Sequence, residues 1–167
     1  MQVTKSSTQE ITLAKTFAAS RETVFSALTQ PGHLIHWLRP TGMTLAICEV
    51  DLRAGGTFRY VFQRAGGFKI EVRGLYEAVE QPSRFAYLET YDFSPLEVRV
   101  TTVLEKNNDN TLFKQTLGYS SEHERDEDFD GVATSAAQAY GNLERYLAGA
   151  SAPLLNGDSQ GTHTKRD

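Results

Sequence analysis

The feature that most constrains the fold is a long series of segments in which apolar and polar residues alternate, running from Met43 to Tyr119. Alternation with a period of two is typical of strands that have one covered and one solvated face. Turn-forming residues such as Gly55-Gly56, Gly66-Gly67 and Pro82 separate the segments,. The pattern therefore predicts an antiparallel meander. Its six strands are expected at residues 43–52, 57–64, 68–79, 84–91, 96–105 and 111–119.

Helices are expected on both sides of this series. A first strand is predicted at residues 11–17, and Ser20 is placed to cap a short helix that ends before Pro31-Gly32,. A second short helix should precede Pro40,. The last element, residues 126–147, has apolar residues at helical spacing, which predicts a long helix lying against the sheet,. Its stripe consists of Phe129, Val132, Ala133, Ala136, Tyr140, Leu143 and Leu147. The fold class is α+β.

The length of 167 residues, 40% of them hydrophobic, suits a single domain,. We place this domain at residues 11–149, between a flexible N-terminus (1–10) and a flexible polar tail (150–167),. The net charge of −4 argues against nucleic acid or an anionic membrane as a partner,. Because the chain shows neither a secretory signal nor an apolar run of about 20 residues, we expect a cytoplasmic protein,.

Motifs for several common chemistries are missing from the sequence. The single cysteine, Cys48, excludes an intrachain disulfide and a multi-cysteine metal centre, and it is interpreted as an inert thiol within a strand,. His33 and His36 are interpreted as a surface pair, and the acidic residues at 126–130 as charges at a helix start,. No serine-nucleophile elbow, phosphate-binding loop or dinucleotide fingerprint occurs,. We expect no metal and no cofactor.

Aromatic residues gather on single faces of adjacent predicted strands, including Phe58, Phe68 and Phe85. Ligand pockets are mostly apolar with a few oriented polar groups, and tyrosine supplies both. Each ring taken alone is also compatible with ordinary core packing. As a group, however, the tyrosines are more polar than a dry core favours, because a buried hydroxyl needs a partner. The candidate ligand-binding residues are Trp37, Tyr60, Phe62, Tyr76, Tyr87, Glu89, Tyr91, Ala136 and Tyr140.

Glu89 is the most conspicuous polar candidate, because it shares the parity of Phe85, Tyr87 and Tyr91. If that face is inward, desolvation raises the pKa of its carboxyl group, which suits a general acid or base. A β-bulge would instead turn Glu89 outward, to the convex face. Lys114 carries the same ambiguity and could pair with it.

Several residue sets, taken in order, resemble the START-like helix-grip (SRPBCC) superfamily and, within it, the family related to the activator of heat-shock protein 90 ATPase. They are Val24-Phe25, Trp37 with Pro40, Asp51-x-Arg53-x-Gly55-Gly56, Gly74-x-Tyr76 with Pro82, and Leu143-Glu144-Arg145-Tyr146-Leu147. The resemblance spans about residues 11–149. It implies a curved antiparallel sheet of about seven strands around a long C-terminal helix. Between them, many relatives hold a lipid, polyketide or other small hydrophobic molecule in an apolar cavity.

The chain departs from this family in its last helix. Relatives often carry a Gly-Trp pair where this sequence has Ser135-Ala136, so an indole is missing. Because protein interiors are close-packed, the small side chains must lead either to closer packing of helix and sheet or to a larger cavity, unless another side chain fills the space. The sequence leaves these outcomes open.

Two classes of function follow from these observations. The first is a binding protein without catalytic residues that holds a small hydrophobic molecule between helix and sheet. The second is a cyclase or hydratase acting on a polyketide-like substrate, with Glu89 as the acid or base. A third, suggested by the family name alone, is a regulator of heat-shock protein 90 with a place in the stress response. An open sheet also has exposed edges that would allow a homodimer.

Overall fold

The computed structural model describes residues 1–151, and the predicted tail lies outside them from residue 152 onward. One antiparallel sheet of eight strands is ordered β1-β2-β8-β7-β6-β5-β4-β3, so β3 to β8 form the predicted meander. The α+β helix-grip fold is therefore confirmed. The strands are β1 Gln2–Ser7, β2 Glu10–Phe17, β3 Met43–Val50, β4 Thr57–Arg64, β5 Lys69–Glu80, β6 Arg84–Tyr91, β7 Glu97–Asn107 and β8 Asn110–Gly118.

Strand β1 is the eighth strand, and it corrects the prediction that residues 1–10 form a flexible segment. It pairs antiparallel with β2 from Gln2, opposite Ala14, to Ser7, opposite Glu10. The Arg125 side chain lies only 6% exposed beside this hairpin, and its guanidinium donates to the carbonyl oxygen of Ser7. The segment is polar, so its order comes from backbone pairing and from this distant arginine rather than from an apolar pattern of its own.

Two short helices follow β2, as predicted. Helix α1 (Arg21–Thr29) is capped by Ser20, whose hydroxyl accepts from the Thr23 amide at 3.2 Å,. Helix α2 (Pro31–Trp37) has proline at its first turn, where the missing N–H is not needed,. Val24, Phe25 and Leu34 are buried against the sheet and the last helix.

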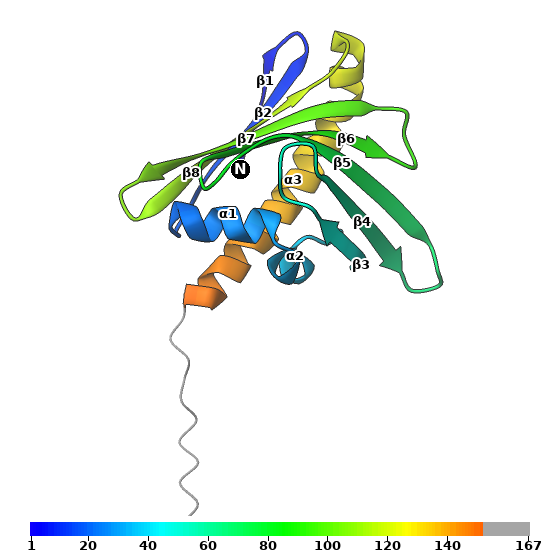
Figure 1. Ribbon diagram of the computed structural model, residues 1–167. Helices are drawn as coiled ribbons and strands as arrows, with labels where there is room; N and C mark the ends of the chain where they lie inside the picture. Colours follow the sequence, from blue (N-terminus) through cyan, green and yellow to red (C-terminus); the bar gives the residue numbers. More distant parts are fainter. Residues whose placement is uncertain (152–167) are drawn as a thin grey trace, which may run out of the picture.

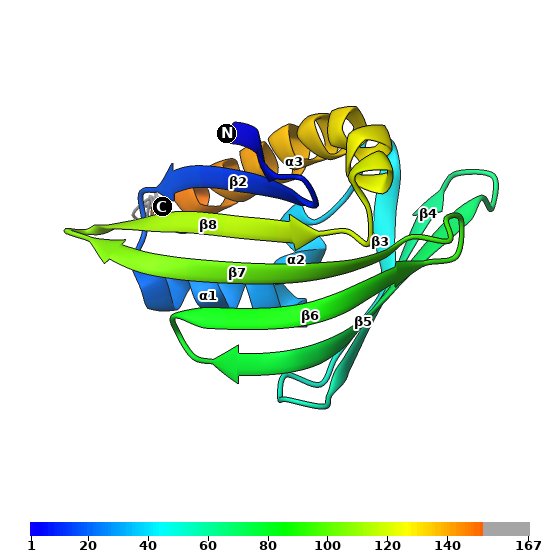
Figure 2. The same cartoon turned by 90° about the horizontal axis from the view of Figure 1, so that it is seen from above.

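Helix α3 (Glu122–Ser151) lies diagonally across the concave side of the curved sheet (Figures 1 and 2). It begins four residues before the predicted start at Asp126, because Ser121 caps it by accepting from the Glu124 amide at 3.2 Å. The acidic residues at 126–130 therefore lie inside the helix and not at its first turn, which corrects their interpretation as helix-start charges. No helix in residues 1–151 is long and apolar enough to cross a membrane.

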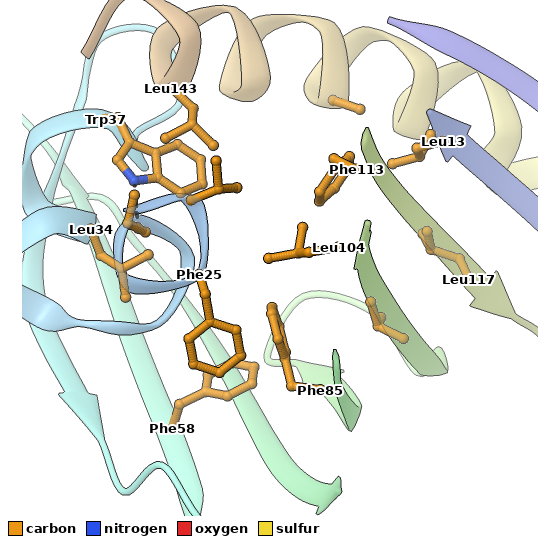
Figure 3. Close-up of a cluster of buried hydrophobic side chains, with 14 of the residues drawn as sticks. Leu13, Phe25, Leu34, Trp37, Phe58, Phe85, Leu104, Phe113, Leu117 and Leu143 are labelled. Atoms are coloured by element: carbon orange, nitrogen blue, oxygen red, sulfur yellow. Dashed lines mark hydrogen bonds between the residues drawn. The ribbon is translucent and has the colours of Figure 1, made fainter. Parts of the chain in front are cut away.

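The core lies between the sheet and the helices. Close-packed side chains from α1, α2 and α3 meet Leu104 of β7 and Phe113 of β8, all within the concavity (Figure 3). Trp37 lies beside Leu143 of α3, and its indole N–H donates to the Ala27 carbonyl at 2.9 Å. Toward β4, β5 and β6 the packing is incomplete, and this is where the cavity lies.

Candidate functional site

A cavity of about 290 Å³ lies between the sheet and the middle of α3. Aromatic rings from α2, β4, β5, β6 and α3 line it together with aliphatic side chains from the sheet and from all three helices. The cavity reaches the surface between α3 and the loop after α2, where the exposed residues Arg39, Ser135 and the partly exposed Gln138 line it. Its volume is close to the lower end of the range for small-molecule sites.

The loop that borders the opening is tied to α3 by side-chain hydrogen bonds. Gln138 donates to the hydroxyl of Thr41. Asn142 donates to the Trp37 carbonyl at 3.3 Å and to the Arg39 carbonyl at 3.5 Å. A molecule that enters by this route passes between α3 and a segment held by a few polar contacts.

Strand β6 carries Glu89 into the cavity wall, on the face that it shares with neighbouring aromatic residues. Phe85, Tyr87, Glu89 and Tyr91 all line the same wall. The register of β6 against β7 is regular from Arg84 to Thr90, so no bulge reverses the parity. The irregularity in this region lies instead in β5, between Tyr76 and Ala78. Glu89 therefore faces the cavity and not the convex surface.

The environment of Glu89 favours its protonated form. Burial raises the pKa of its carboxyl group from an ordinary value of 4.5 to about 7,. The hydroxyl groups of Tyr91 and Tyr87 hydrogen bond to the carboxylate and partly counteract this shift, whereas the nearby negative charge of Asp128 adds to it. A carboxyl group with a pKa near neutrality can both accept and donate a proton.

Other polar groups of the wall already have protein partners. The Tyr140 hydroxyl donates to Gln115 Oε1 at 2.8 Å, and Gln115 Nε2 donates to the Thr102 hydroxyl at 3.0 Å. The hydroxyls of Tyr60 and Tyr76 hydrogen bond to each other. Burial raises the pKa of the Tyr60, Tyr76, Tyr87, Tyr91 and Tyr140 hydroxyls, so all five are neutral around pH 7.

The aromatic wall depends on a glycine. Phe58 stacks on Tyr60 with ring centroids 4.6 Å apart and meets Tyr87 edge-on at 5.0 Å. Its ring lies directly over Gly74 of β5, where an added Cβ would come within 1.9 Å of the ring. Gly74 therefore makes room for Phe58 (Figure 3 shows Phe58 and Phe85 on this side of the core).

The cavity borders the position of α3 at which relatives often carry the indole that this chain lacks. Ala136 is buried, and together with Ser135 and Ala139 it lines the cavity. Tyr60 and Tyr87 line the same cavity as Ala136. Of the outcomes that the sequence left open, the structure shows a cavity at this position.

All nine candidate ligand-binding residues line this one cavity. One other expectation is wrong, and one ambiguity is resolved. Phe68 lies just before β5 and is 57% exposed, with the Arg64 guanidinium 5.6 Å from its ring centroid. Lys114 is exposed on the convex face of β8, because the inward residues of that strand are its neighbours Phe113 and Gln115.

Gln115 and Asp128 are functional candidates that the sequence analysis missed. Gln115 shares the parity of buried Phe113 and Leu117, so a polar residue within an apolar alternation was the available signal. Asp128 accepts from the Tyr119 hydroxyl at 2.7 Å. Asp128 comes near Glu89 only in the folded chain. Because it lies in a run of acidic residues, nothing in the sequence distinguishes it from its neighbours.

Cys48, His33 and His36 lie away from the cavity wall. Burial raises the pKa of the Cys48 thiol to about 11. His33 shares a hydrogen bond of 2.7 Å with the Tyr146 hydroxyl, and His36 stacks on the same ring. Within the described part of the chain, no three acidic, histidine or cysteine side chains gather in a way that could hold a metal ion.

A curved antiparallel sheet closed by a long C-terminal helix, with a lined cavity between them, defines a START-like helix-grip domain of the SRPBCC type. The family model described as "Activator of Hsp90 ATPase homolog 1-like protein" matches residues 18–148. The chain therefore belongs to this family, as its sequence motifs predict.

Solved structures agree with this assignment. A protein of Rhodobacter sphaeroides is 28% identical, with a TM-score of 0.85 over 89% of this chain and 97% of that one. CalU16 of Micromonospora echinospora is 22% identical, with a TM-score of 0.59 over 83% and 76%. DynU16, from the dynemicin biosynthetic locus, is 15% identical, with a TM-score of 0.69 over 85% of this chain but 48% of its own. Comparison with curated protein sequences gives no significant match.

Proposed function

We propose that the protein binds a small, largely apolar molecule in the cavity between the sheet and α3. The observation that carries this proposal is the cavity of about 290 Å³, walled by aromatic rings and lined by the small side chain of Ala136. Burial of apolar surface would drive binding, at about 25 cal/mol for each Å² removed from water. The similarity to DynU16 is compatible with a ligand from secondary metabolism, but at 15% identity it supports the fold alone.

Native mass spectrometry of freshly purified protein tests this function. We expect the measured mass to exceed that of the chain by one small-molecule increment, and extraction should release the molecule. The variant Ala136→Trp restores the indole common in relatives and should abolish the increment. Ala137→Trp, at an exposed position of the same helix, should retain it. A bare mass for the wild type, together with an unchanged melting temperature across a panel of small apolar compounds, would contradict the proposal.

A specific observation also favours the second candidate, an acid–base enzyme. Glu89 lies in the cavity beside the hydroxyls of Tyr87 and Tyr91, with a pKa of about 7. This is the arrangement by which a carboxyl group could move a proton on a bound carbonyl compound. Once the ligand is identified, incubation with wild type should convert it, and Glu89→Gln should bind it unchanged. An unaltered ligand after incubation with wild type would leave binding as the function.

The heat-shock protein 90 partner in the family's name and the cytoplasmic location stay predictions for this chain. Function is a property of the site and not of the fold, so the cavity is the better guide.

A further inference from the structure

The inference concerns the chemistry of the ligand and rests on the proposed binding function. Glu89 makes no ion pair with any residue in the described part of the chain. Its neighbours in the cavity are tyrosine hydroxyls, which are neutral. A buried carboxylate without a cationic partner is costly, so the protein leaves this charge without compensation.

The surroundings of Glu89 add negative and not positive charge. Asp128 of α3 is near enough to disfavour a charge on Glu89. Arg39, the basic residue of the cavity wall, is exposed at the opening and makes no ion pair with Glu89. Six residues interact electrostatically with Glu89. They lie on β4, on β6, in the segment after β8, and on α3. They are Tyr60, Tyr87, Tyr91, Tyr119, Asp128 and Tyr140.

Aromatic rings line the same cavity as Glu89. Tyr60 stacks on Phe58, and Tyr76 and Tyr87 meet edge to face with ring centroids 6.0 Å apart. The faces of such rings carry partial negative charge and attract cations. A carboxylate among aromatic rings, with no ion-pair partner in the described part of the chain, complements an organic cation better than it complements a neutral or anionic molecule.

We propose that the cavity selects hydrophobic molecules that carry a protonated amine, with the ammonium group against Glu89 and the apolar body among the rings of β4, β5 and β6. The ammonium supplies the positive partner that the protein lacks, and its N–H groups donate to the Glu89 carboxylate. The hydroxyls of Tyr87 and Tyr91 keep their contacts with the same carboxylate. Binding thereby stabilises the ionised form of Glu89, which the free protein disfavours.

Two probes of matched shape test this inference by calorimetric titration at a pH of about 8. They are 2-naphthylmethylamine, which is a cation, and 2-naphthylmethanol, which is neutral. We expect the wild type to bind the amine at least about tenfold more tightly than the alcohol, since the amine gains a charged hydrogen bond to Glu89 and cation contacts with the rings. Glu89→Gln should remove this preference and keep affinity for the alcohol.

Control variants separate cavity binding from attraction to an acidic surface. Glu105→Gln removes one exposed negative charge from β7 and should leave the preference for the amine intact. Ala136→Trp should abolish binding of both probes. Equal affinities of the wild type for amine and alcohol, or an unchanged preference in Glu89→Gln, would overturn this inference but leave the proposed function standing. Failure of the wild type to bind either probe would overturn the inference and count against the proposed function as well.

Discussion

At the scale of single residues, Glu89 lies where its charge is unfavourable for folding. The pKa of its carboxyl group rises from 4.5 to about 7 on folding, because the cavity wall removes water from it,. Between these two values the folded protein holds a proton that the unfolded chain has lost. Stability therefore falls as the pH rises through this window. Such a cost is typical of a residue kept for function.

Glu89→Gln should stabilise the protein in a pH-dependent way. The amide does not ionise, so the gain over the wild type should be small at about pH 5 and reach at most about 3 kcal/mol at about pH 8. Urea unfolding at both pH values measures it. Glu105→Gln is the control, because its side chain is exposed. A gain that is the same at both pH values would show that Glu89 is not buried in the folded state.

Cys48 should react slowly, because burial raises the pKa of its thiol to about 11. We expect alkylation by iodoacetamide at about pH 8 to be at least about tenfold slower than that of glutathione. Intact-mass measurements follow the reaction, with urea-unfolded protein as the control. Alkylation of the folded protein at the rate of glutathione would show that this thiol is activated.

At the scale of elements, the strands follow from local alternation, but their faces and partners follow only in part. In β6 the alternation of inward and outward side chains continues without interruption along the strand, and it places Glu89 in the cavity. In β8 the sequence left the inward parity open, and the structure turns Lys114, on the parity of Leu112 and Thr116, to the exposed face. A shift of one residue moves every side chain to the other face, so a strand with threonine on both parities is ambiguous.

Gly74 tests how the sheet accommodates the aromatic wall. Gly74→Ala should destabilise the protein by about 1–3 kcal/mol, because the new methyl group overlaps the Phe58 ring,. Gly32→Ala in α2 is the matched control, since no atom lies within 4 Å of the added Cβ. It should be neutral or stabilise by up to about 1 kcal/mol. Equal effects of the two substitutions in urea unfolding would argue against the close approach of Phe58 to the β5 backbone.

Strand β1 was not predictable from the sequence, because its anchor lies 118 residues away, at Arg125. Arg125 also contacts Asp126 and Glu122, so its charge is paired at the edge of the sheet. Arg125→Met should therefore loosen the β1–β2 hairpin. Hydrogen exchange should become faster at residues 2–7 and stay unchanged in β6. Arg53→Met, which removes an exposed pair with Asp51, serves as the control,. Unchanged exchange at residues 2–7 would show that backbone pairing alone holds β1.

At the scale of the whole molecule, the cavity is the outcome that sequence patterns could not decide. The helix stripe and the ring-bearing strands locate the wall, but the volume left between them depends on how closely α3 approaches the sheet. Ala136 faces that space, and the neighbouring rings pack on one another without filling it. Such a space costs packing energy, which a bound guest would recover.

Titration of 2-naphthylmethanol into wild type, Ala136→Trp and Ala137→Trp tests most directly whether a guest-sized space lies beneath α3. We predict saturable binding of one molecule to wild type and to Ala137→Trp. Ala136→Trp should show no binding although it unfolds as cooperatively as the wild type. Binding of equal affinity to all three proteins, or none to the wild type, would contradict the presence of this site.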